Sequence, residues 1–140
     1  MFYPMKFEPV LKDYIWGGRN LERFGKQLKE EKVAESWEVS CHPDGMSVIQ
    51  NGKFQGRTLQ SLIDQFGAQI TGNHADSSFP LLVKLIDAND RLSVQVHPND
   101  EYARIHEGEA GKNEMWYILD AKPGARLIFD VKPGVNRGCF

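Results

Sequence analysis

At 140 residues the chain has the usual length of a single domain and can bury a hydrophobic core without covalent staples. Its 17 lysines and arginines are interspersed with 19 aspartates and glutamates, which excludes a strongly basic surface for nucleic acid or an anionic membrane. Two cysteines outside any CxxC pattern, no basic leader and no apolar run of bilayer length predict a soluble, cytoplasmic protein with a small-molecule partner.

The first forty residues predict short strands separated by turns. Residues 5–14 mix apolar and charged side chains around Pro9, which indicates an edge strand or an extended arm. Residues 19–24 can form one or two helical turns that end at Gly25. Residues 33–41 alternate in the manner of a strand. One face of that strand would carry Val33, Glu35, Trp37, Val39 and Cys41.

A turn, a second strand and a helix are predicted next. Pro43-Asp44-Gly45 is typical of a turn, and residues 46–50 resume as a short strand. Asn51-Gly52 is the dipeptide most typical of a two-residue hairpin. Residues 58–66 place their apolar side chains at helical spacing, with Thr58 as the N-cap, and this is the clearest helix in the sequence.

The centre of the sequence predicts a pair of strands. The apolar run at 81–86 is typical of a buried strand, and the polar residues 87–90 form a turn. A second strand over 91–97 then follows, which should be the antiparallel neighbour of the first. Pro98 cannot continue a central strand, so this strand should end there.

The last third predicts a short helix, two more strands and a tail. Asn99 or Asp100 can cap the helix, and strands are expected at 114–119 and 125–130. Many short strands with little helix favour an antiparallel sandwich or barrel. We expect one domain over 1–130 and an irregular tail over 131–140. The oligomeric state stays open, and an exposed sheet edge would allow self-association.

Three polar side chains near the centre suggest a metal site. Gln95 and His97 share one face of an extended segment, about 7 Å apart at their α-carbons. Glu114 heads a later predicted strand. An amide, an imidazole and a carboxylate form a mixed N/O ligand set that suits zinc or another divalent transition metal.

These segments carry a resemblance to a known family. Residues 95–100 (QVHPND) and 111–117 (GKNEMWY) resemble the metal-binding segment of type I mannose-6-phosphate isomerases. Residues 9–18, 34–43 and 79–88 resemble other family segments in the same order. The resemblance, closest to the short bacterial form, implies a mainly β, cupin-type antiparallel jelly roll with one or two short helices, complete or incomplete.

The resemblance also implies roles for individual residues. Gln95, His97 and Glu114 match three ligands of one zinc ion, and Lys112 matches an active-site lysine that acts in acid/base chemistry or substrate binding. The family's fourth ligand, a histidine, and an active-site arginine belong to later segments. The chain is therefore expected to correspond to the amino-terminal portion of the enzyme.

The function implied is the zinc-dependent interconversion of mannose 6-phosphate and fructose 6-phosphate. Ser47 and Lys84, together with Lys112, are the candidates for binding the substrate phosphate. Lys84 has two equal interpretations, an inward active-site cation or a side chain that reaches out from a sheet edge. The alternative function is a non-catalytic, metal-holding cupin module that binds a sugar or a sugar phosphate.

Overall fold

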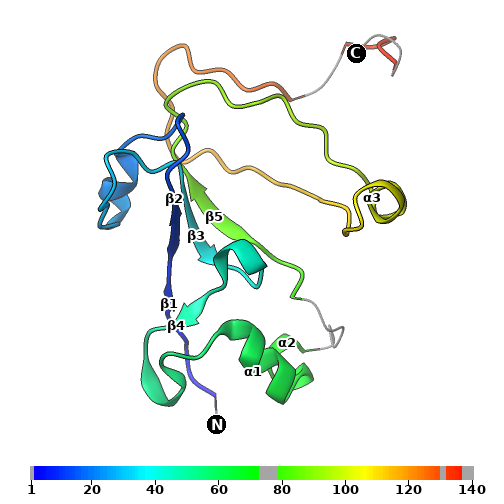
Figure 1. Cartoon of the computed structure of the whole chain (residues 1–140). Coiled ribbons are helices and arrows are strands. Elements are labelled where there is room, and N and C mark those ends of the chain that lie inside the picture. Colours follow the sequence, from blue (N-terminus) through cyan, green and yellow to red (C-terminus); the bar gives the residue numbers. More distant parts are fainter. Residues whose placement is uncertain (1, 73–78, 130–131, 137–140) are drawn as a thin grey trace. The chain divides into compact units, whose positions relative to one another are not determined.

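The chain forms two compact units, which are described separately. The computed structural model describes residues 2–72, 79–129 and 132–136 (Figure 1). The first unit ends at Leu92 and the second begins at Ser93. The strands are antiparallel, and the helices are short. Among the described residues, no helix is both long and apolar enough to cross a membrane.

A three-stranded sheet forms the centre of the first unit. Its order is β2 (Val10–Lys12), β3 (Glu35–Val39) and β5 (Val83–Ile86), and Figure 1 shows the three strands side by side. In this sheet Val10 lies opposite Trp37, and Trp37 lies opposite Lys84. The strand predicted at 33–41 is thus confirmed as β3. Both of its faces are covered, since Ser36 and Trp37 are both buried, so alternation did not separate an inner from an outer face.

A second, two-stranded sheet pairs β1 (Phe7–Glu8) with β4 (Val48–Ile49). Because β1 and β2 lie at the edges of their sheets, the prediction of an edge strand for 5–14 is confirmed. Ile49 of β4 contributes to a small core with Phe54 and Leu62. Against this core pack Phe2, Tyr3, Met5, Phe7 and Phe66.

The helices of the first unit begin and end where local chemistry predicts. Thr58 caps α1 (Leu59–Phe66), because its Oγ1 accepts a hydrogen bond from Ser61 N at 3.1 Å. The short helix α2 (Ala68–Thr71) follows directly and lies beside α1 (Figure 1). A 3₁₀ helix, Asn20–Phe24, ends at Gly25 in the left-handed conformation, as predicted. Pro43–Gly45 and Gly52–Phe54 form further 3₁₀ turns.

The turn at Asn51-Gly52 is longer than the two-residue hairpin that the dipeptide predicts. The chain closes instead over residues 50–55, because Gly56 N donates to Ile49 O at 2.8 Å. Asn51 is held to the N-terminal arm by its side chain. Its Oδ1 accepts from Lys6 N at 2.8 Å, and its Nδ2 donates to Pro4 O at 3.1 Å. These tertiary hydrogen bonds outweigh the local turn preference.

A buried carboxylate, that of Asp87, lies where β5 of the three-stranded sheet ends. Asp87, which is 6% exposed, follows β5 directly. Its Oδ2 accepts from Asn20 N at 2.8 Å, and its Oδ1 accepts from Asn20 Nδ2 at 2.8 Å and Asn89 Nδ2 at 2.6 Å. The carboxylate thus fixes the start of the 3₁₀ helix to the end of β5, and its charge is matched by three N–H donors.

The second unit contains α3 (Asp100–His106), which confirms the predicted short helix. Asn99 is its N-cap, since Oδ1 accepts from Tyr102 N at 2.9 Å. The described part of the predicted tail, 132–136, contains a turn closed by Val135 N donating to Lys132 O. The rest of that tail, together with Asp130, lies outside the described residues.

Three strand predictions are wrong. Residues 91–97, 114–119 and the described part of 125–130 form no strand, and β5 pairs with β3 instead of with 91–97. The prediction that 81–86 is buried is also wrong, because Leu81 and Val83 are 59% and 48% exposed. An apolar run indicates what a segment can bury. It does not supply the neighbouring chain that a ladder of hydrogen bonds requires.

Cys41, just after β3, is expected to react slowly. Burial, with a smaller contribution from the charge of Asp64, raises the pKa of its thiol from 9.0 to about 11. Two pKa units lower the thiolate fraction at pH 8 by about 100-fold, and only the thiolate is alkylated. In a Cys139→Ser variant, which keeps Cys41 as the one thiol, iodoacetamide should label the native protein about 100-fold more slowly than the urea-unfolded protein. Equal rates would contradict the burial argument.

Candidate metal centre

The backbone around α3 brings two segments of the second unit into contact. Lys112 N donates to Pro98 O at 3.1 Å, and Gly111 N donates to Asp100 Oδ1 at 2.9 Å. Gly111 leaves no room for a side chain, because a Cβ there would lie 2.5 Å from Asn99 C and Asp100 N. The segments that precede and follow α3 therefore lie backbone against backbone.

This contact places His97 against Glu114. His97 Nε2 lies 2.6 Å from Glu114 Oε2, and the two side chains are 23% and 25% exposed. The imidazole and the carboxylate come from residues 17 positions apart, so the tertiary structure and not local sequence joins them. Of the three predicted ligands, these two are brought together.

The environment of Glu114 favours its ionised form. Partial burial acts to raise the pKa of this carboxyl group. Hydrogen bonds from Trp116 and His97, followed by the nearby charges of Lys112 and His97, act in the opposite direction and prevail. The pKa of Glu114 therefore lies below its ordinary value, and the group is an anion at neutral pH. An anionic carboxylate is the form that binds a metal ion.

The other predicted residues of the second unit lie near this pair in sequence. Gln95 is exposed, and its Nε2 donates to Ser93 Oγ at 2.9 Å, while its amide makes no hydrogen bond to His97 or Glu114 within the described chain. The amide oxygen can bind a cation while the amide nitrogen keeps its bond to Ser93. Lys112 is exposed and acts electrostatically on Glu114.

Two of the three predicted phosphate ligands, Ser47 and Lys84, lie in the first unit and have partners there. Lys84 Nζ lies 3.0 Å from Glu35 Oε1, and only 19% of the lysine side chain is exposed. The choice between its two interpretations, an active-site cation or a side chain that reaches out from a sheet edge, stays a prediction. Ser47 is buried, and its Oγ accepts a hydrogen bond from Ser40 N at 2.8 Å.

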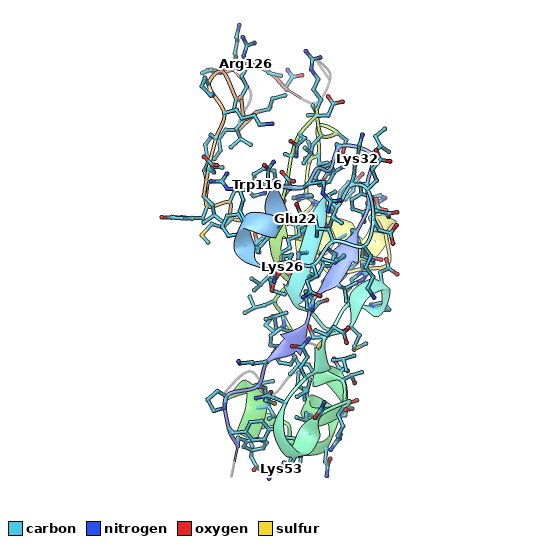
Figure 2. The ribbon with its side chains drawn as sticks, turned by 90° about the vertical axis from the view of Figure 1, so that its left-hand side faces the viewer. Glu22, Lys26, Lys32, Lys53, Trp116 and Arg126 are labelled. Atoms are coloured by element: carbon cyan, nitrogen blue, oxygen red, sulfur yellow. The ribbon has the colours of Figure 1, made fainter. Side chains whose placement is uncertain are left out.

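Two grooves lie on the first unit, with volumes of about 470 and 720 Å³. Neither is lined by Ser47 or Lys84. The larger one contacts the sheet edge and the loop that follows the first 3₁₀ helix, including Lys26, which Figure 2 labels. Lys26 is paired, since its Nζ lies 2.6 Å from Glu38 Oε2.

The donor chemistry of the second unit fits a divalent metal such as zinc. An imidazole nitrogen and an anionic carboxylate oxygen are standard zinc donors. The described residues include no group of three or more histidine, cysteine, aspartate or glutamate side chains that could hold an ion. A third protein ligand within the described chain would therefore have a different chemistry, such as an amide oxygen.

One influence on the pKa of Glu114 was missed from the sequence. Trp116, which is 42% exposed, contributes to lowering the pKa of the Glu114 carboxyl group. The spacing of Glu114 and Trp116 was the available signal, because side chains two residues apart share a face of an extended chain. The same Glu-x-Trp pattern occurs at Glu35 and Trp37, where the indole Nε1 donates to Glu35 Oε2 at 2.7 Å.

The sequence of this chain is similar to those of known isomerases. A family model for the catalytic domain of type I phosphomannose isomerase matches residues 5–124. Mannose-6-phosphate isomerase ManA of Bacillus subtilis is 46% identical over 127 residues, which cover 90% of this chain and 40% of the relative. The mannose-6-phosphate isomerase of Streptococcus mutans is 44% identical over 130 residues, which cover 92% of this chain and 41% of the relative.

A solved structure agrees with these matches. The crystal structure of mannose 6-phosphate isomerase from Bacillus subtilis superimposes with a TM-score of 0.80 at 43% identity, and covers 85% of this chain and 38% of that chain. The chain thus spans about 40% of the length of these relatives. The antiparallel sheets and this likeness confirm the predicted mainly β, cupin-type fold class. From the matched family model and the relatives together, we conclude that the chain belongs to the type I phosphomannose isomerase family.

Proposed function

We propose that this chain acts in the interconversion of mannose 6-phosphate and fructose 6-phosphate, with one zinc ion held by Gln95, His97 and Glu114. The observation that carries the proposal is the 2.6 Å contact between His97 and Glu114, which places an imidazole nitrogen beside an anionic oxygen donor. The proposal also agrees with the family to which the chain belongs, because the relatives are named mannose-6-phosphate isomerases.

The reaction requires a proton to leave C2 of the aldose and a proton to be added to C1. The hydroxyl proton on O2 is lost as O1 gains one, so the sugar changes neither its formula nor its oxidation level. When bound, zinc supplies a Lewis acid for the oxygens of the sugar. In the proposed site His97 and Glu114 hold the ion, and Lys112 either transfers the proton or binds the sugar.

The proposed partner is a small sugar phosphate in the cytoplasm. Ser47 and Lys84 stay predictions for phosphate binding. The ammonium group of Lys84 already has the Glu35 carboxylate 3.0 Å away. To bind the phosphate, Lys84 would have to exchange this contact for one with a phosphate oxygen. The alternative is a metal-holding module that binds a sugar phosphate without turnover.

A coupled assay for fructose 6-phosphate formation in the presence of zinc tests the proposal. We expect turnover of mannose 6-phosphate, and a Lys112→Ala variant should lose about 100-fold or more of kcat/KM, the usual effect of removing a general acid or base. Lys122→Ala, a matched change in a turn of the same unit, should keep the activity. Binding of mannose 6-phosphate without turnover would favour the module instead, and absence of both would contradict both functions.

A further inference from the structure

We propose that two apolar segments of the second unit, residues 114–119 and 125–129, form a docking surface for the carboxy-terminal part of a type I phosphomannose isomerase, supplied as a separate polypeptide. Figure 2 labels one residue of each segment, Trp116 and Arg126. The proposal rests on the family to which the chain belongs and on the surface of the second unit. It does not depend on the proposed metal site, so either can fail without the other.

Both segments expose large apolar side chains. Every residue from 112 to 129 is exposed. In the first segment Met115 and Tyr117 are 86% and 81% exposed, and in the second Ile128 and Phe129 are 74% and 91% exposed. Soluble monomeric proteins rarely expose large apolar side chains in such numbers along one stretch of chain, and a contiguous patch of them marks an interaction site.

The second unit has almost no core of its own. Of the buried apolar side chains that the structure describes, only Ala103 belongs to this unit. The cluster of Ile49, Phe54 and Leu62 lies in the first unit. One buried methyl group cannot offset the conformational entropy lost when a unit of this size becomes ordered. The apolar segments therefore require a further polypeptide against which to bury their side chains.

The residue types of these segments suit the pairing of strands. Trp116, Tyr117 and Ile118 favour strands, yet residues 114–119 belong to no strand of the described chain. A turn joins the two segments, because Ala125 N donates to Lys122 O at 3.0 Å. A segment of this composition can pair with a strand of another chain through backbone hydrogen bonds, while its side chains fill pockets in the partner.

The relatives indicate which partner this is. The match to ManA of Bacillus subtilis covers 90% of this chain and 40% of ManA, so about 60% of ManA lies outside it. The solved isomerase from Bacillus subtilis superimposes on 85% of this chain. The first unit ends at Leu92 of 140 residues and cannot supply that share alone, so part of the second unit also matches the relative's chain. A second copy of this chain would bring the same exposed segments and none of the remaining 60%.

Co-expression tests the docking. This chain carries an affinity tag, the second polypeptide is the part of ManA outside the match, and no zinc is added. We expect the two to co-purify in a 1:1 ratio. Hydrogen exchange of the backbone amides in 114–119 and 125–129 should slow at least about 10-fold in the complex, while exchange in α1 stays unchanged. Elution of this chain alone, or as an oligomer of itself without the ManA part, would overturn the proposal.

Two substitutions test the surface itself. Ile118→Asp and Ile128→Asp would each bury a carboxylate without a partner, so the yield of the ManA part on the tagged chain should fall more than about 10-fold. Ile105→Asp is the matched control, because Ile105 lies on α3 of the same unit, is 72% exposed and stands outside both segments. All three side chains are exposed, so circular dichroism should show unchanged secondary structure. Equal yields with all three variants would overturn the proposal.

Discussion

Replacing His97 with alanine is expected to abolish stoichiometric zinc binding, with a fall in affinity of more than about 100-fold, beyond the range for partners outside the first coordination sphere. The substitution removes the one nitrogen donor of the proposed ligand set. It also leaves Glu114 without the imidazole that lies 2.6 Å from it. The remaining carboxylate and amide oxygens form an all-oxygen set, which suits magnesium or calcium better than zinc.

Elemental analysis of purified protein, before and after dialysis against a competing chelator, measures this loss. His106→Ala is the matched control. His106 lies on α3 of the same unit, where its ring is 4.1 Å from that of Tyr102. The control should retain the zinc content of the unsubstituted chain. Zinc retained by His97→Ala at one equivalent would show that the ion is bound elsewhere.

The largest effect on stability is expected from Leu62→Ala in α1. Leu62 is fully buried and packs in the small core with Ile49 and Phe54. The substitution removes buried apolar contacts and leaves a cavity, which together cost about 2–5 kcal/mol of unfolding free energy for a buried leucine. Because a domain of this size has only about 5–15 kcal/mol of stability, the variant should lose a large part of it.

Urea unfolding followed by circular dichroism gives the change in unfolding free energy. Leu81→Ala is the matched control in the same unit, because its side chain is 59% exposed. Surface substitutions of this kind change stability by about 0.5 kcal/mol or less. A Leu62→Ala variant as stable as Leu81→Ala would mean that the cluster around Ile49 contributes little to the stability of the unit.

Elements with local signals could be predicted from the sequence. Helix α1 has an N-cap at Thr58, apolar residues at helical spacing and a glycine at its end, so its limits follow from nearby residues. The 3₁₀ helix that ends at Gly25 is a similar case. The strands expected at 91–97 and 114–119 had only an apolar pattern. A strand exists through hydrogen bonds to a neighbouring strand, and no local pattern encodes where that neighbour lies.

Only part of the candidate site could be predicted, because some of its contacts join segments that are distant in the sequence. The residue types and the family resemblance pointed to His97 and Glu114, and the turn of chain around α3 brings them together. The effect of Trp116 on the pKa of Glu114 had a signal in the spacing of the two residues, which an aromatic residue in an apolar run conceals. The pairing of Lys84 with Glu35 joins two strands 49 residues apart, and neither segment alone indicates it.

The two hydrogen bonds that hold the Asn51 side chain to the N-terminal arm have a consequence for the chemical ageing of the protein. An asparagine followed by glycine deamidates when the backbone nitrogen of the glycine attacks the side-chain amide carbon and expels ammonia through a cyclic imide. Here Lys6 and Pro4 hold the oxygen and the nitrogen of that amide, so both bonds must break before Gly52 can reach the carbon. Damage at this position should therefore accumulate mainly in molecules whose N-terminal arm has detached, and its extent records how long a preparation has spent partly unfolded.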